Sequence, residues 1–193
     1  MHRRPLLLLL DDYLARHPDE EETVVRMRTL VETHEDCLLR SCAPGHVTAS
    51  AWIASPDRRR FLLTHHRKLD RWLQLGGHVD GEAEPDAAAL REAREESGME
   101  RFEICAAGDR PLVVDLDVHV IPARGDEPEH EHHDVRFLLI AAPGQTAVRN
   151  EESKELRWFR NDELAAVAGD EAVARLGRKA IALLERLGPV AGG

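Results

Sequence analysis

Three glutamates in one short segment have the spacing that a metal site requires. Glu92, Glu95 and Glu96 stand at positions i, i+3 and i+4, so in a helix their carboxylates project from one stripe. Like charges at this spacing destabilise an isolated helix, and a bound cation is the natural compensation. Carboxylate oxygens are ligands that Mg²⁺ and Mn²⁺ prefer, and these ions in turn hold phosphates. The stripe therefore predicts metal-assisted phosphate chemistry.

The same stripe has a simpler interpretation, a solvated helix face stabilised by pairs such as Arg91 with Glu95. Taken alone, the stripe favours this simpler interpretation, and only the pattern of the whole stretch favours a metal site. A Gly76-Gly77 turn precedes the helix, and the small side chains of Ala89 and Ala93, with Leu90, occupy the opposite arc. We therefore expect a helix with one side packed on a sheet and the other side facing a metal.

The whole stretch resembles the Nudix box, in which a glycine is followed at fixed distances by Arg-Glu, Glu-Glu and a second glycine. Ala93 stands where the box has an aliphatic residue, and Ala83 stands where it has its first glutamate. The neighbours Glu82 and Glu84 are candidates to replace that glutamate. Because type and spacing coincide in a strand, loop and helix context, the resemblance is specific. The matching residues are Gly77, Arg91, Glu92, Glu95, Glu96, Gly98 and Met99.

The resemblance implies which residues act. Glu92, Glu95 and Glu96, with the backbone carbonyl of Gly77, would bind Mg²⁺ or Mn²⁺, and Arg91 would hold the loop and helix together through a carboxylate partner. The implied reaction is hydrolysis of the diphosphate linkage in a nucleoside diphosphate joined to another group, by attack of water on phosphorus. The general base stays open among five acids, namely Glu95, Glu129, Glu131, Glu151 and Glu152.

Two other functions fit the same fold. A noncatalytic nucleotide sensor would explain the departure at Ala83, although sensors often lose box carboxylates that this chain retains. A prenyl diphosphate isomerase would need a catalytic cysteine in a specific context, and Cys37, Cys42 and Cys105 do not provide one that we recognise. Diphosphate hydrolysis is therefore preferred.

Composition limits the partners and the compartment. The 193 residues carry a formal net charge of −10, which argues against binding a nucleic-acid polymer and leaves a phosphorylated small molecule as the expected partner. An odd number of cysteines without zinc-like pairing favours a reducing compartment. The apolar run 6–10 is too short to cross a membrane, so we expect a cytoplasmic protein without membrane contact. A homodimer is compatible with the sequence.

Hydrophobic periodicity predicts the elements that position the box. A helical extension over 1–43 would contain helices at 6–16 and 19–40, and a Nudix domain over 44–193 would follow, with the resemblance covering about 46–168. The expected fold class is α/β, a Nudix-type α/β/α sandwich with a mixed sheet. Its strands are expected at 47–53, 61–65, 73–75, 114–120, 137–142 and 155–159, and its helices after Pro85, at 162–168 and at 171–187.

Two further groups of side chains are candidates for substrate binding. His119 lies on the polar face of strand 114–120, and His130 and His132 share a face with Asp134 if the segment 127–134 is extended. These histidines predict a transition-metal or phosphate site, or else only an exposed loop. His65 and Arg67 precede Trp72 and offer cations and a ring to a nucleotide, although a plain basic turn is the alternative.

Overall fold

A computed structural model describes residues 2–151 and 153–188. The chain begins with helix α1 (Arg4–Arg16), a 3-10 turn η1 (Pro18–Glu20) and helix α2 (Glu21–Thr33). The predicted helix 19–40 is thus too long, because His34 is extended (φ −119°, ψ 111°) and successive turns follow it. Within the described ranges, no helix is long and apolar enough to cross a membrane.

An eight-stranded mixed sheet forms the centre of the molecule. Its strands run in the order β10-β2-β1-β9-β5, with β3 beside β2, β4 beside β1 and β8 beside β9. The central pair β1–β9 is parallel, and the other pairs are antiparallel. The bounds are β1 (Gly45–Ala54), β2 (Arg60–His66), β3 (Arg71–Leu73), β4 (Leu75–His78), β5 (Phe102–Ile104), β8 (Val113–Ile121), β9 (His130–Ala141) and β10 (Ser153–Arg160), besides a small β6 (Ala106–Ala107) and β7 (Arg110–Pro111) ribbon.

Strand β1 changes its antiparallel partner along its length. Residues 48–51 pair with β4, whereas Ile53 and Ala54 pair with β2. The predicted strand 73–75 is accordingly divided at Gln74, because β3 follows β2 and β4 follows β1. The two neighbours of β1 diverge, and residues of β1, β2 and β4 line a cavity there.

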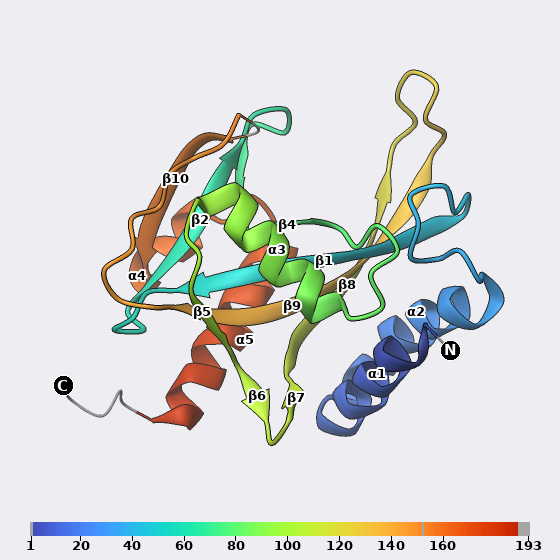
Figure 1. Ribbon diagram of the computed structural model, residues 1–193, viewed down its shortest axis with the longest axis horizontal. Helices are drawn as coiled ribbons and strands as arrows, with labels where there is room; N and C mark the ends of the chain where they lie inside the picture. The colour runs from blue at the N-terminus through green and yellow to red at the C-terminus, as the bar shows by residue number, and fades with distance from the viewer. Residues whose placement is uncertain (1, 152, 189–193) are drawn as a thin grey trace.

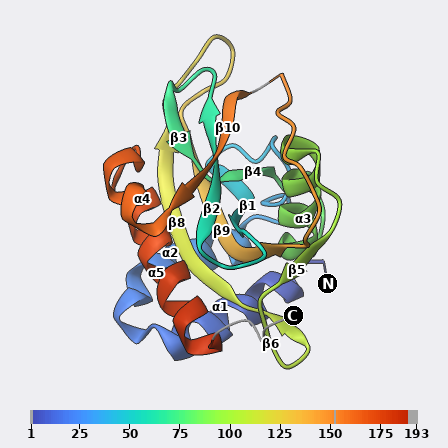
Figure 2. The same ribbon diagram turned by 90° about the vertical axis from the view of Figure 1, so that its left-hand side faces the viewer.

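Helices cover both faces of the sheet, as the predicted α/β/α sandwich requires. Helix α3 (Pro85–Ser97) lies on one face, and α4 (Asn161–Val167) and α5 (Glu171–Leu187) lie on the other (Figures 1 and 2). Pro85 occupies the first turn of α3, and Gly98 ends it with φ +66°, a left-handed conformation that favours glycine. The small side chains of Ala88, Ala89 and Ala93 are buried, so α3 packs closely on the sheet.

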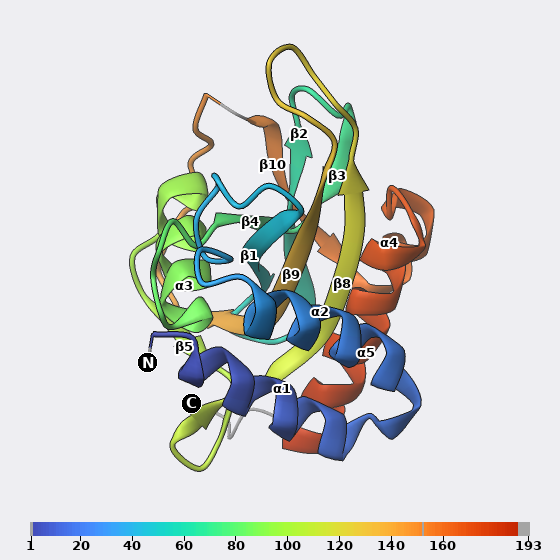
Figure 3. The ribbon, with the colours of Figure 1, turned by 90° about the vertical axis from the view of Figure 1, so that its right-hand side faces the viewer.

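The N-terminal helices pack on the domain rather than extending from it. Figure 3 shows α1 and α2 side by side, next to β8 and α5. Leu6, Tyr13 and Met27 belong to the same buried cluster as Val47 and Phe137 of the sheet. The helices α1 and α2 therefore share a hydrophobic core with the sheet, while the division into two domains stays a prediction.

The polar face of β8 is buried at one end only, because Asp115 is buried whereas His119 on the same face is exposed. Asp115 is fully buried because α5 covers it and supplies Arg175 and Lys179 as partners, at 2.9 and 2.6 Å. Arg136 of β9 contributes a third cation at 3.1 Å. Lys179 also donates to the hydroxyl of Tyr13 at 2.7 Å, so this ionic network joins the N-terminal helices to the sheet and α5.

Candidate functional site

The carboxylates of α3 lie in the wall of a cavity. This cavity has a volume of about 810 Å³ and opens where β4 and β2 diverge. Glu92, Glu95 and Glu96 line it together with Gly77, as the sequence predicts. Glu95 is largely exposed, whereas Glu92 and Glu96 are more deeply placed. Helix α3 thus places three carboxylates in the wall of one cavity, and their side chains differ in burial.

Arg91 fastens the helix to the loop before it. Its guanidinium donates to the carbonyl of His78 at 2.8 Å and to the Glu92 carboxylate at 2.6 Å. Its Nε lies 3.8 Å from a carboxylate oxygen of Glu82. Arg91 thus has a carboxylate partner in the loop before the helix, and Glu84 precedes the first turn of α3 as its N-cap residue.

Gly77 is required by its distance to Glu92. A Cβ atom on Gly77 would lie 2.7 Å from the carboxyl carbon of Glu92 and 2.7 Å from one of its oxygens. Any larger residue would displace this carboxylate. Burial raises the pKa of Glu92, although Arg91 beside it acts in the opposite direction. A half-buried carboxylate packed against a backbone turn is a donor set that fits a hard divalent cation such as Mg²⁺ or Mn²⁺.

The cavity carries more acids than bases. Six carboxylic residues line it against three lysines and arginines. Such a surface repels a diphosphate until cations neutralise it. The acids are Asp80, Glu92, Glu95, Glu96, Asp134 and Glu151, and the bases are Arg40, Lys68 and Arg91.

The structure separates the candidates for the general base. Glu95 and Glu151 line the cavity. Glu131 forms ion pairs with Arg26 and His133, and Glu129 is exposed in the loop between β8 and β9, so neither is among the lining residues. Glu152 lies outside the described residues. Of the five candidates, Glu95 and Glu151 are thus the described acids that line the cavity.

Of the six predicted substrate contacts, His119 and His132 line the cavity. The other four are outside its lining and make structural contacts. Trp72 packs edge-on against Phe159 with ring centroids 4.8 Å apart, and His65 lies against Trp72 at 5.0 Å. Arg67 donates to the carbonyls of Glu151 and Ser153 at 2.8 and 3.2 Å, and His130 bonds to the Pro128 carbonyl at 2.9 Å.

Sequence reasoning missed several cavity residues because they depend on strand orientation. Successive side chains of β2 point to opposite faces, so Thr64 and His66 line the cavity while His65 does not. Thr48 and Ser50 of β1 also line it and donate to Asp134 at 3.1 and 2.9 Å. The alternation of side chains in β1 and β2 separates the two faces of each strand. Which face lines the cavity follows only when the pairing partners of the strands are known.

The histidines near the cavity are packed together. His46 of β1 is 1% exposed, and its ring centroid lies 4.9 Å from that of His78 and 4.8 Å from that of His132. Burial and neighbouring imidazoles lower the pKa of His46 to about 4 and that of His132 to about 2. Both rings are therefore neutral near pH 7 and offer lone pairs rather than positive charge.

The fold and the site define the class of protein. A family model described as "NUDIX domain" matches residues 44–180, so the chain belongs to the Nudix family, and the family and fold predicted from the sequence are confirmed.

Individual relatives agree with this assignment. Two strains of Mycobacterium tuberculosis (CDC 1551 / Oshkosh and H37Rv) have a protein named "Putative 8-oxo-dGTP diphosphatase 3" that is 31% identical over 119 residues, which cover 57% of this chain and 49% of that protein. The chain thus matches about half the length of these curated relatives.

Solved structures show the same fold. A Nudix-family hydrolase from Clostridium perfringens has a TM-score of 0.58 at 24% identity, covering 72% of this chain and 97% of its own. The Ap4A hydrolase of Caenorhabditis elegans in a binary complex has a TM-score of 0.58 at 20% identity, covering 72% and 98%. RenU, a Nudix hydrolase from Mycobacterium smegmatis, has a TM-score of 0.55 at 20% identity, covering 77% and 90%.

Proposed function

We propose that this protein hydrolyses the diphosphate linkage of a nucleoside diphosphate derivative with the help of Mg²⁺ or Mn²⁺. The observation that carries the proposal is the convergence of Glu92, Glu95, Glu96 and the Gly77 turn on one cavity of about 810 Å³. When bound there, divalent ions supply charge neutralisation and a more acidic water. The names of the relatives, which include an 8-oxo-dGTP diphosphatase and an Ap4A hydrolase, support a nucleotide substrate.

The residues of this chain have distinct parts in the proposed reaction. Glu92, Glu96 and the Gly77 carbonyl hold the cations, and Arg91 fixes the helix that carries the carboxylates. Glu95 or Glu151 accepts a proton from water, which attacks one phosphorus while the P–O bond to the bridging oxygen breaks. Lys68 and Arg40 line the same cavity and are placed to contact the phosphates of the substrate.

A substrate panel tests this proposal. Nucleoside triphosphates including 8-oxo-dGTP, dinucleoside polyphosphates, ADP-ribose, NADH, coenzyme A and nucleotide sugars are incubated with Mg²⁺ or Mn²⁺. We expect turnover of at least one class, lost in Glu96→Gln and kept in Glu103→Gln, which removes an exposed charge on β5. Binding without turnover by the wild type would favour a sensor, and isomerised prenyl diphosphate would favour the isomerase.

The general base is assigned by comparing two variants on the best substrate. General acid–base catalysis contributes roughly 10²–10⁴-fold, so the variant lacking the base should lose kcat by that factor. Glu95→Gln and Glu151→Gln should therefore differ strongly. Equal and small effects of both would exclude the two described acids from this role.

The remaining expectations are also proposals. Three free cysteines support a reducing, cytoplasmic location. The negative net charge supports a small phosphorylated partner over a nucleic-acid polymer or a membrane surface. A homodimer is proposed as the assembly, and sedimentation at several protein concentrations would test it.

A further inference from the structure

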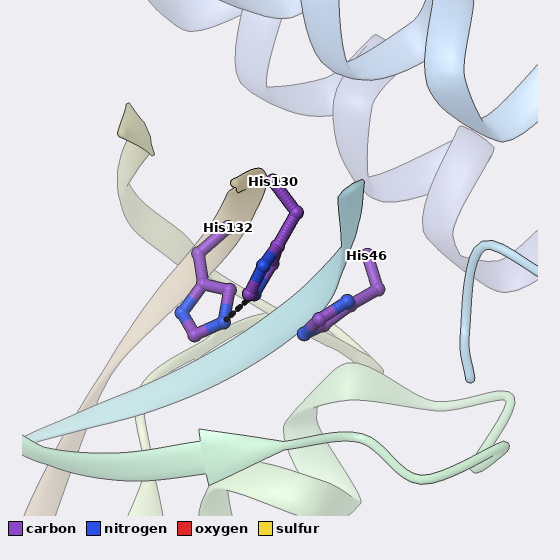
Figure 4. A group of neighbouring side chains, drawn as sticks. All are labelled: His46, His130 and His132. Atoms are coloured by element: carbon purple, nitrogen blue, oxygen red, sulfur yellow. Dashed lines mark hydrogen bonds between the residues drawn. The ribbon is translucent and has the colours of Figure 1, made fainter. Parts of the chain in front are cut away.

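Three histidines that are distant in sequence from the carboxylate helix come together on the sheet. We call His46, His130 and His132 the histidine cluster (Figure 4). In the parallel β1–β9 pair His46 stands opposite His132, and in the antiparallel β8–β9 pair His132 stands opposite His119. His130 precedes His132 by two residues and so shares its face. Strand register therefore brings these imidazoles together.

The spacing of the cluster is close to that of a metal site. One ligand nitrogen from each ring lies within 4.8 Å of the other two, and the Nε2 atoms of His130 and His132 are 3.4 Å apart. Two nitrogens bound to a tetrahedral Zn²⁺ at 2.0–2.1 Å lie about 3.3–3.4 Å apart. The His130 and His132 pair already has this separation, and His46 needs to approach by at most about 1.4 Å.

The ring nitrogens of His46 are unsatisfied hydrogen-bonding groups within the described structure. The His46 side chain is buried, and among the described residues neither of its ring nitrogens has a hydrogen-bond partner. Leaving a buried polar group unsatisfied costs about 1–3 kcal/mol, so such groups usually bind something. The ring is stacked on that of His130 with centroids 4.9 Å apart, so a metal ion would bind at the edges of the two rings, where their in-plane nitrogens lie, after a rotation of His46.

His130 is already oriented as a ligand. Its Nδ1 lies 2.9 Å from the Pro128 carbonyl, which only accepts hydrogen bonds, so Nδ1 carries the proton. In the neutral ring the lone pair is then on Nε2, which faces His132. A metal-binding histidine commonly donates its second N–H to a carbonyl in this way.

We propose that the histidine cluster binds one transition-metal ion of the Zn²⁺ class, separately from the cations of α3. Imidazole ligands select Zn²⁺, Co²⁺, Ni²⁺ or Cu²⁺, whereas Mg²⁺ prefers oxygen. Three protein ligands leave a coordination position open. Because His132 also lines the cavity of the α3 carboxylates, this position is next to the space where a phosphorylated ligand would lie. The proposal does not depend on the proposed hydrolysis.

Metal binding to the full chain tests this site. Protein freed of metal by a chelator is titrated with Zn²⁺ in excess Mg²⁺ by calorimetry, and with Co²⁺ by visible absorption. We expect one equivalent to bind to the wild type, to Glu96→Gln and to His65→Gln, a histidine outside the cluster. Affinity should fall in His46→Gln and His132→Gln by more than the roughly 10–100-fold that loss of an outer-shell partner costs.

Two results would overturn the site. One is a folded wild type that binds no Zn²⁺ under excess Mg²⁺, and the other is binding that is lost in Glu96→Gln and retained in the cluster variants. Circular dichroism checks that each variant folds, and His132→Gln carries the test if the buried His46 cannot be replaced. Ring ¹⁵N resonances of the wild type need no variant, and Zn²⁺ should shift those of three histidines.

Discussion

Arg136 is a buried cation that contacts three carboxylates, and replacing it should destabilise the fold strongly. The side chain is 3% exposed and contacts Asp134, Asp115 and Asp117 at 2.7, 3.1 and 3.1 Å. Asp115 retains Arg175 and Lys179, and Asp117 retains Arg175. Asp134 keeps only polar partners in the described structure, mainly the hydroxyls of Thr48 and Ser50. Arg136→Met would thus leave a buried negative charge without a cation.

Breaking a buried ion pair on one side costs about 3–5 kcal/mol. For a domain of this size each kcal/mol lowers Tm by about 2–4 °C, so Arg136→Met should lower Tm by about 6–20 °C. Urea unfolding measures the free energy directly. Arg160→Met is the matched control, because the Arg160–Asp162 pair is mostly exposed and should contribute less than about 1 kcal/mol.

A second substitution tests whether the charge is the cause. In Arg136→Met/Asp134→Asn the uncompensated carboxylate is removed, and part of the lost stability should return. A loss below about 1 kcal/mol in Arg136→Met at an unchanged denaturant m value would refute this account of the ionic network.

Three other perturbations have defined outcomes. Gly77→Ala must push the Glu92 carboxylate from 2.7 Å to an ordinary contact of 3.4 Å, and a shift approaching 1 Å should cost about 10²-fold in kcat/KM with little change in Tm. Burial raises the pKa of Cys42 and of Cys105 to about 11, so iodoacetamide at pH 8 should modify both slowly until the protein is unfolded. Lys179→Met should destabilise by about 1.5–3 kcal/mol in urea, because it removes charged hydrogen bonds from α5 to Tyr13 of α1 and to Asp115 of β8.

Each of these three predictions has a result that would contradict it. Wild-type kinetics in Gly77→Ala would mean that the position of the Glu92 carboxylate is not critical for activity. Gly169→Ala is the control, because Gly169 is also crowded but lies outside the cavity lining. Rapid alkylation of the folded protein would contradict the burial of the thiols. A Lys179→Met variant as stable as the wild type would show that the ionic network does not hold the N-terminal helices.

The box helix was predictable because its determinants are local. Pro85 at the start, Gly98 at the end and the alternation of alanines with glutamates all act within one element. Arg91 and Glu92 follow from the same spacing. The contact between Glu82 and Arg91 needed the structure, because it depends on how the loop approaches Arg91.

The histidines and the buried acids were harder to predict because strand register joins distant segments. His46 and His132 are opposite one another only through the parallel β1–β9 pair, and Asp115 is buried only because α5 returns over β8. Alternation in β8 correctly identified a polar face but not what covers it. The early end of α2 at Thr33 likewise reflects turns after His34 that periodicity does not reveal.

Hydrolysis in ¹⁸O-labelled water tests the central proposal most directly. The best substrate of the panel is turned over with Mg²⁺ or Mn²⁺ by the wild type and by Glu96→Gln, and the products are examined by mass spectrometry. The proposed mechanism predicts one ¹⁸O in a phosphate group of a product and loss of turnover in the variant. Label in a group other than phosphate, or equal turnover by Glu96→Gln, would contradict attack of water on phosphorus at the carboxylates of α3.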